Sequence, residues 1–266
     1  MKSLNSYICE GFFGNVGAVP DVDGWIKAYN DSNDLFNIDT DYVDIDKYGR
    51  ATIHPKAMYG RLAKPGYIDL RINDQNKDIL FPDGALPPYI TFSKEKWDDI
   101  EILNACNTGD LNITSMRGFP TKFSSLKIST SPSNRTVTMS NWMKKGVCKS
   151  LEFISIAPID VDNLPKTQSL TMYFYAGSTA EAKSDNLNNA LTGLMKKWDG
   201  WKYLKEFKIS IGNKANLTDE NKKVLFEMDS FIKENYPEMY KHRSYRLIDN
   251  LLNNSNYYSI DMVFVM

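Results

Sequence analysis

The sequence predicts an α+β protein in which an irregular β-solenoid or sheet lies between an N-terminal helix-hairpin cap and C-terminal helices. Three observations lead to this class. Short apolar-polar-apolar triplets recur through the middle of the chain, helical periodicity occupies the last third, and a helix followed by an alternating run precedes the triplets. These patterns divide the chain into a tag and flexible linker, the cap, a repeat region and a C-terminal α/β part, at residues 1–17, 18–65, 66–177 and 178–266.

The cap begins with a helix predicted over residues 21–32, where apolar side chains recur at helical spacing after an acidic start. An alternating run on both sides of residues 47–49 then predicts a β-hairpin. Its period of two places Val43 and Ile45 toward the core.

The repeat region is predicted from triplets that each read as one short strand, with two apolar residues inward and one polar residue outward. One such strand cannot bury its own apolar edge, whereas stacked strands form a continuous core. The alternative is an ordinary α+β sheet whose strands share the same pattern. The triplets are Leu70–Ile72, Leu111–Ile113, Leu126–Ile128, Val137–Met139, Ile154–Ile156, Leu170–Met172 and Phe207–Ile209.

The C-terminal part is predicted to contain two helices and two strands. A helix over residues 179–198 is followed by a strand over 204–211, and Thr218 caps the second helix. The last ten residues, 257–266, are apolar and β-branched. We expect them to form an inner strand or a protected edge, because an open apolar edge would aggregate.

Composition excludes several classes of protein. The 32 Lys and Arg against 33 Asp and Glu give a net charge of -1, which argues against a dedicated nucleic-acid binder. A basic-aromatic segment at residues 240–246 predicts weak nucleic-acid contact at most. No apolar run is long enough for a membrane span, and Asn5, Ser6 and Glu10 interrupt the apolar core that a secretion signal requires.

No catalytic or metal-binding motif is present in the sequence. It lacks the nucleophile elbow, both phosphate-binding glycine loops, the paired zinc-binding histidines and the Cys-x-x-Cys pair. His54 and His242 are its two histidines, and Cys148 has no histidine near it in sequence, so we expect a buried rather than an activated thiol. The sequence therefore predicts a non-enzymatic protein with no cofactor and no metal.

Two segments of the chain resemble known protein families. The first, Leu111–Ser129, LNITSMRGFPTKFSSLKIS, resembles the irregular leucine-rich repeats of gut-bacterial and phage-associated proteins. The resemblance implies repeats over about residues 66–175, although the Asn/Cys ladder position of regular repeats is not evident. The matching residues are Ile113, Thr114, Ser115, Met116, Gly118, Pro120 and Lys122.

The second segment is the first ten residues, MKSLNSYICE, which resemble the capsid-targeting sequence of internal head proteins of T-even-type phages. In that family the prohead protease cuts after an Ile/Leu-x-Glu triplet and before a small residue. The resemblance therefore implies a processing site at Ile8, Glu10 and Gly11. The alternative is an N-terminal turn that packs on the domain.

These inferences predict a binding surface on the outward residues of the strands, with a protein as the partner. We expect a phage or prophage recognition protein in the virion head or the host cytoplasm. The alternative is a bacterial repeat protein that binds a host protein or a glycan. The candidate surface residues are Arg71, Lys127, Thr138, Ser155, Tyr173 and Tyr175.

Overall fold

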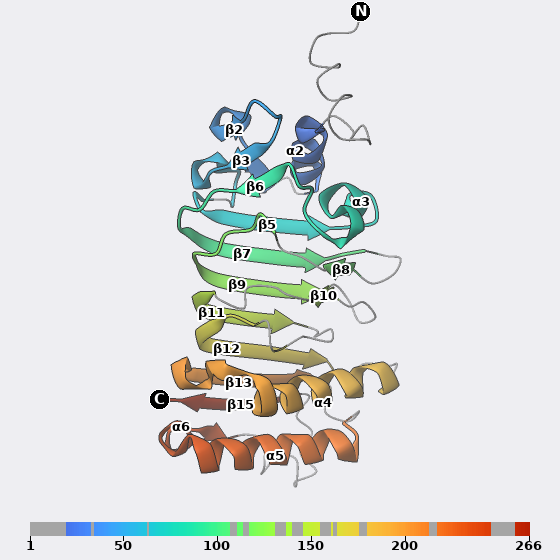
Figure 1. Cartoon of the computed structure of the whole chain (residues 1–266). Helices are drawn as coiled ribbons and strands as arrows, with labels where there is room; N and C mark the ends of the chain where they lie inside the picture. The colour runs from blue at the N-terminus through green and yellow to red at the C-terminus, as the bar shows by residue number, and fades with distance from the viewer. Residues whose placement is uncertain are drawn as a thin grey trace, which may run out of the picture.

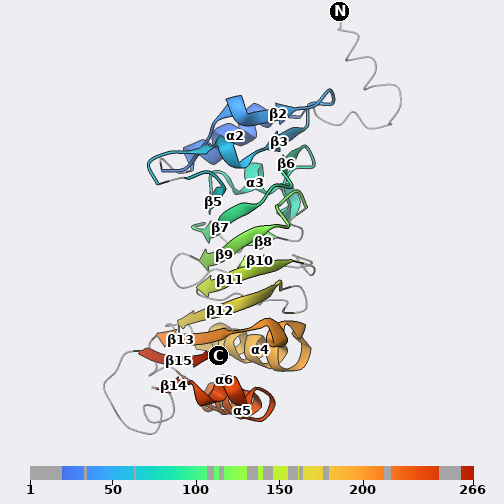
Figure 2. The same cartoon turned by 90° about the vertical axis from the view of Figure 1, so that its left-hand side faces the viewer.

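The computed structural model has an elongated shape in which strands are stacked along the long axis (Figures 1 and 2). Helix α2 (Val22–Asp31) lies near one end of this stack, and helix α5 (Asp219–Asn235) lies at the other. The structure describes residues 20–32, 35–62, 64–106, 111–113, 117–130, 137–139, 146–154, 161, 164–175, 180–212, 217–245 and 259–266.

Helix α2 forms where the sequence predicts it. Asp21 is its N-cap, and the Oδ1 atom of Asp21 accepts a hydrogen bond of 2.9 Å from the Gly24 backbone N–H. Trp25 and Tyr29 are fully buried on the inner face of the helix, and their rings stack with centroids 5.8 Å apart. This apolar face attaches α2 to the rest of the protein.

The predicted hairpin is also present, but one of the two residues that were predicted to face the core does not face it. Strands β2 (Val43–Ile45) and β3 (Ala51–Ile53) pair antiparallel, and β6 (Ile90–Phe92) joins β3 in parallel. Val43 is half-buried against the core, whereas Ile45 is 58% exposed. Ile45 ends β2, which is the edge strand of this sheet. The smaller elements nearby are β1 (Asn37–Ile38), η1 (Thr40–Tyr42), η2 (Pro55–Ala57), β4 (Met58–Tyr59), α3 (Lys77–Leu80) and η3 (Pro82–Gly84).

The main sheet has eight strands in the order β14-β15-β13-β12-β11-β9-β7-β5. The six strands from β5 to β13 are parallel and follow chain order, whereas β15 pairs antiparallel with β13 and with β14. The strands are β5 (Tyr67–Ile72), β7 (Trp97–Asn104), β9 (Phe123–Thr130), β11 (Val147–Ile154), β12 (Lys166–Tyr175), β13 (Glu206–Gly212), β14 (Ser244–Tyr245) and β15 (Ser259–Val265).

The prediction of a leucine-rich-repeat-like β-solenoid is wrong. The fold is α+β, and its main sheet is mixed, since two antiparallel strands complete it at its C-terminal end. The triplets Leu111–Ile113 (β8) and Val137–Met139 (β10) do not join this sheet and pair with each other in a separate parallel pair. Of the triplet Ile154–Ile156 only Ile154 is described, and it faces outward, not inward as predicted. The reason is that apolar-polar-apolar alternation reports a half-buried strand and does not specify how the chain returns to the next one.

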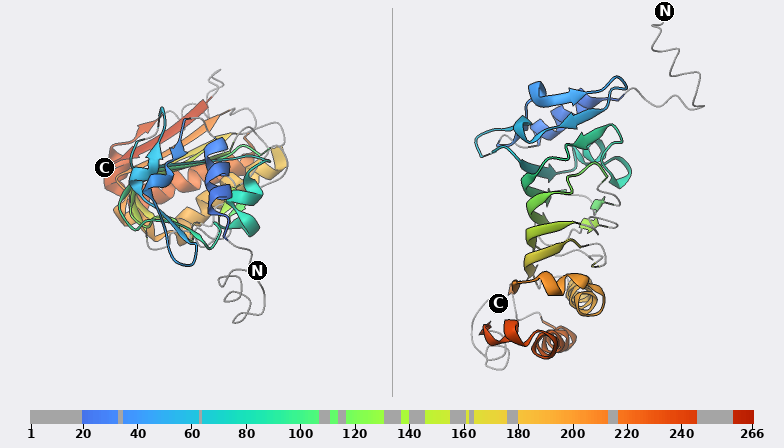
Figure 3. Two further views of the ribbon diagram at one scale, coloured as in Figure 1. Left: turned by 90° about the horizontal axis from the view of Figure 1, so that it is seen from above. Right: turned by 60° about the vertical axis from the view of Figure 1, so that its left-hand side comes forward.

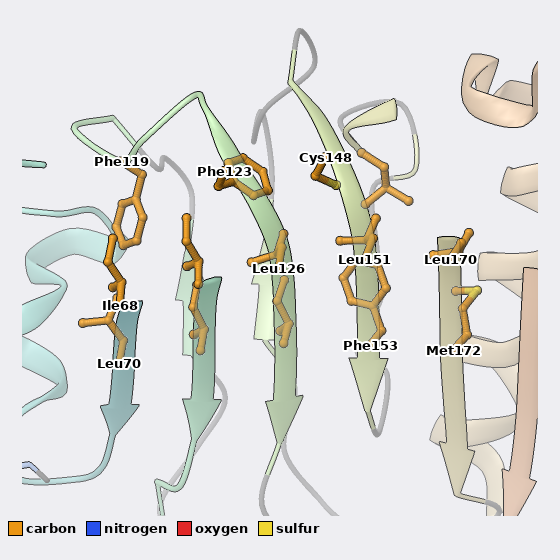
Figure 4. Packing of buried hydrophobic residues seen from close by; sticks show 14 of the residues in the cluster. Ile68, Leu70, Phe119, Phe123, Leu126, Cys148, Leu151, Phe153, Leu170 and Met172 are labelled. Carbon is orange, nitrogen blue, oxygen red and sulfur yellow. The ribbon is translucent and has the colours of Figure 1, made fainter. Parts of the chain in front are cut away.

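Two rows of inward side chains form the core of the main sheet (Figure 4). Because strand neighbours are in register, the apolar residue of each strand stacks on that of the next. One row is Ile68, Ile100, Leu126, Leu151, Leu170, Phe207 and Phe264, and the other is Leu70, Ile102, Ile128, Phe153, Met172, Ile209 and Met262.

The helices α3 and α4 (Ala180–Lys197) and the strands β8 and β10 lie on the core side of the sheet (Figure 3). Helix α5 packs on α4, and Thr218 caps it as predicted. The Asn221 side chain completes a capping box with Thr218. The buried Trp201 of η5 (Asp199–Tyr203) contacts Phe207 of β13 and Phe231 of α5. Helix α6 (Pro237–Lys241) follows and packs on β15.

Both predicted C-terminal strands are confirmed, and β15 is an inner strand between β13 and β14. At the other side of the sheet, the edge of β5 is closed by a side chain: the Asp69 backbone N–H donates a hydrogen bond of 3.1 Å to the Tyr29 hydroxyl. Both residues are buried.

None of the described helices is both long enough and apolar enough to span a membrane.

Candidate functional site

The candidate site is the face of the main sheet that points away from the core. From β5 to β12, none of the helices drawn in Figure 3 covers this face. We call it the open face and define it by the outward residues of β5 to β13, which are mostly half-buried. They are Tyr67, Asp69, Arg71, Asp99, Glu101, Leu103, Ser125, Lys127, Ser129, Ser150, Glu152, Ile154, Ser169, Thr171, Tyr173, Glu206, Lys208 and Ser210.

The central row of the open face carries charges of both signs. Lys127 of β9 lies between two carboxylates, with its Nζ atom 3.4 Å from Glu101 Oε1 on β7 and 3.9 Å from Glu152 Oε1 on β11. The row continues through Thr171 to Lys208. The Lys127 side chain is 39% exposed, so these ion pairs contribute little to the stability of the fold. Their effect is to orient the Lys127 ammonium group between the two carboxylates.

A second row, toward the strand starts, is held together by hydroxyl groups. The Ser125 hydroxyl donates a hydrogen bond of 2.6 Å to Asp99, and the Tyr67 hydroxyl donates one of 2.7 Å to Glu101. Burial and the neighbouring Glu101 carboxylate raise the pKa of Tyr67, so its hydroxyl stays protonated and remains a donor. The polar side chains of this row are therefore oriented before any partner arrives.

The third row carries a guanidinium at its β5 end and an aromatic ring on β12. Lys208 Nζ lies 5.6 Å from the centroid of the Tyr173 ring, a cation–π distance. Arg71 contacts Asp69 at 3.2 Å and lies over the Phe36 ring at 5.9 Å. Aromatic and Arg side chains of this kind are enriched at protein interfaces.

The structure places three of the predicted surface residues on the open face, spread over strands β5, β9 and β12. Arg71 and Tyr173 share one row of the open face, and Lys127 lies in the next. The expectation that Thr138 lines the same sheet is wrong, because its short strand β10 belongs to a separate sheet, where it pairs with β8. Tyr175 ends β12 opposite Gly212, and its side chain is not among those that the structure describes. Ser155 and the predicted processing residues Ile8, Glu10 and Gly11 lie outside the described residues.

Sequence reasoning missed the acidic side chains of the open face. Strand β7 was not predicted, so Asp99 and Glu101 were not placed. A signal was available, because Ile100-Glu101-Ile102 has the same apolar-polar-apolar pattern as the predicted triplets. Glu152 was missed because β11 begins earlier than its predicted triplet.

A second polar cluster surrounds His54 beside the hairpin. Its Nε2 lies 2.9 Å from Asp44 Oδ2 and its Nδ1 lies 3.1 Å from Glu95 Oε2, while the Ser93 hydroxyl donates to the same Glu95 oxygen. The hydrogen bonds to Glu95 and to Asp44 raise the pKa of His54. With a carboxylate at each ring nitrogen, the imidazolium is the form that can donate to both.

The thiol of Cys148 is buried, and burial raises its pKa to about 11. It is therefore not an activated nucleophile at neutral pH. Within the part of the chain that is described, no three His, Cys, Asp or Glu side chains are grouped to hold a metal ion.

Together, fold and site define an α+β protein with one polar, pre-ordered sheet face. Comparison with known proteins assigns no family to it, since no family model, no curated protein and no solved structure gives a significant match.

Proposed function

We propose that this chain is a non-catalytic recognition protein that binds another protein through the open face. The observation that carries the proposal is the network on that face, in which Lys127 joins Glu101 and Glu152 across three neighbouring strands. Half-buried Arg71 and Tyr173 lie on the same face, and Arg and Tyr are enriched at protein interfaces. The mixed charges would select a partner of complementary charge.

Pre-organisation supports the same proposal. The hydrogen bonds of Ser125 and Tyr67 orient Asp99 and Glu101, and the buried rows behind them fix the strands. A partner that binds here orders few side chains, which lowers the entropic cost of association. A rigid sheet also places its outward groups at a constant spacing of about 4.8 Å between strands.

Site-specific photo-crosslinking tests this function. A photoreactive amino acid at Thr171, in the central row, is expected to yield a discrete adduct with one protein in the cells that produce this chain. The matched control is the same amino acid at Tyr48, which is 64% exposed in the hairpin between β2 and β3, at the end of the strand stack opposite to β12 (Figure 1). Lys127→Glu is expected to remove the adduct, because it converts the central cation into a third neighbouring carboxylate.

The proposal fails if position 171 gives no adduct, or if positions 171 and 48 give the same set. Binding of a purified glycan that depends on Tyr173 and Lys127, without any protein adduct, would favour the alternative of a glycan-binding protein. In that case the ring of Tyr173 would stack on a sugar.

For the location of the protein, we propose packaging into a phage head, addressed by the first ten residues. The support is the sequence resemblance of MKSLNSYICE, with Ile8 and Glu10 placed before Gly11 as a prohead protease requires. Co-expression of the full chain with such a protease is expected to remove ten residues, as read by intact mass. Glu10→Gln is the control that should block cleavage. An uncut wild-type chain that is also absent from purified virions would refute this address.

A further inference from the structure

The side of the main sheet on which the strands start carries an excess of lysines between β9 and β13. Strands β5 to β13 are parallel, so they all start on the same side of the stack, at the left in Figure 1. Five lysines lie at these starts or in η5, which leads into β13, and all but Lys166 are exposed. We call them the basic edge: Lys122, Lys149, Lys166, Lys202 and Lys205.

Carboxylates in the same region do not balance these lysines. Lys127 and Lys208 on the adjoining open face bring the lysines of β9 to β13 and η5 from five to seven. The described carboxylates of the same part of the sheet are three: Glu152, Asp199 and Glu206. A carboxylate at Met266, whose N–H donates a hydrogen bond of 2.7 Å to the Lys205 carbonyl, would still leave an excess of three lysines (7 − 4).

Most of these lysines also lack a carboxylate neighbour. Lys127 lies between Glu101 and Glu152, and Lys166 Nζ is 3.4 Å from Asp199 Oδ2. Among the described residues, no carboxylate lies within 4.0 Å of the other five: Lys122, Lys149, Lys202, Lys205 and Lys208.

The first two strands of the sheet differ from this region. At β5 and β7, Lys64 contacts Asp99 at 3.1 Å and Lys96 contacts Asp98 at 3.7 Å. Arg71 contacts Asp69 in the same way, at 3.2 Å. The cations without a carboxylate neighbour are therefore gathered on the β9 to β13 half of this side of the sheet.

We propose that the basic edge binds an acidic segment of the protein that is recognised at the open face. This inference rests on the proposed function, and it adds the charge of the partner and the place where its acidic part binds. Lys149 on β11 and Lys205 on β13 are exposed on the two sides of Gln168 on β12. Two strand spacings separate them by about 10 Å, which an extended chain spans with about three residues. Lysines without a carboxylate neighbour steer and orient such a segment by charge complementarity.

The aromatic side chain of the basic edge favours a protein over a single-stranded nucleic acid. Single strands bind basic surfaces by stacking their bases on aromatic rings. The ring of Tyr203 is already in contact with two cations, since Lys166 Nζ and Lys202 Nζ lie 5.1 and 5.3 Å from its centroid. Val147, which pairs with Lys166 across β11 and β12 and is 60% exposed, adds an apolar contact suited to a protein.

Fluorescence anisotropy with a fluorescein-labelled peptide of about ten glutamates tests the basic edge on the full chain. At about 50 mM salt we expect a dissociation constant on the order of 100 μM, which should rise with ionic strength. The double variant K149E/K205E is expected to raise it at least tenfold, because two cations become carboxylates.

The matched control is K47E/K94E, which makes the same change of charge at two exposed lysines near the other end of the stack (Figure 1). It should change the dissociation constant by less than about threefold, because charges more than a Debye length away are screened. Circular dichroism melting establishes that each variant is folded.

Crosslinking connects this result to the cellular partner. A photoreactive amino acid at Gln168 is expected to capture the same protein as position 171, through a peptide rich in Asp and Glu. A crosslinked peptide without this enrichment would count against the proposal.

Absence of peptide binding would overturn the proposal, and so would an equal loss of binding in the two double variants. Tighter binding of an oligodeoxythymidine of about ten nucleotides would overturn the choice of a protein. An adduct at Thr171 alongside any of these results leaves the function of the open face intact and refutes the basic edge alone. Peptide binding that K149E/K205E abolishes, with no adduct at Thr171, refutes the function of the open face and supports the basic edge.

Discussion

Tyr29→Phe is expected to destabilise the protein by about 2 kcal/mol, because the hydroxyl of Tyr29 closes the edge of the main sheet. That oxygen accepts the Asp69 backbone N–H at 3.1 Å, and the two residues are 0% and 1% exposed. Without it, no water can reach the Asp69 N–H unless the edge opens. An unsatisfied buried donor costs about 1–3 kcal/mol, and the small gain from a more apolar ring offsets only part of this.

Urea denaturation measures the effect. With a slope of about 3 kcal/mol per M, a loss of about 2 kcal/mol lowers the midpoint by roughly 0.7 M. Tyr48→Phe is the control, because Tyr48 is 64% exposed and should change stability by less than about 0.5 kcal/mol. Hydrogen exchange adds a local readout: the Asp69 amide should exchange faster in Tyr29→Phe than in the control. If the two variants have equal stability and Asp69 keeps its protection, the edge-closing role of α2 is incorrect.

Three further predictions concern a turn, a titrating group and a thiol. Gly118→Ala should lower the melting temperature by about 5 °C relative to Ser124→Ala, since Gly118 has φ +92° and an added Cβ would lie 2.8 Å from the Ile90 carbonyl oxygen; equal melting would contradict this. Because the folded pKa of His54 is raised, its stabilisation should be complete below about pH 6.5 and should decline as pH rises through the folded pKa. The difference in unfolding free energy between wild type and His54→Gln should therefore shrink from pH 6 to pH 9, and a constant or growing difference would show that the two carboxylates do not act on this ring. Cys148, with a pKa of about 11, should resist iodoacetamide at pH 8 in the folded protein and react in urea, as read by peptide mass spectrometry; rapid labelling of the folded chain would show that the thiol is accessible.

The sequence determined the local elements for reasons that act over a few residues. Asp21 and Thr218 cap helices because their side chains satisfy nearby backbone N–H groups, and those bonds depend on neighbours three residues away. The alternation around Leu70, Leu126 and Leu170 likewise gave strands with the correct face inward. Apolar residues at 257–266 indicated an inner strand or a protected edge, and β15 lies between β13 and the short strand β14.

Only the tertiary structure decided which strands pair with one another and which side chains meet on the open face. The same alternation places Leu111–Ile113 in a separate two-stranded pair and Leu126–Ile128 in the main sheet, because pairing depends on residues distant in sequence. The neighbours of Lys127 are a further example: Glu101 is 26 positions before it and Glu152 is 25 positions after it, as the strand register fixes. A sequence pattern reports which face of a strand is buried, whereas the set of side chains that meet on the opposite face follows from strand order and register.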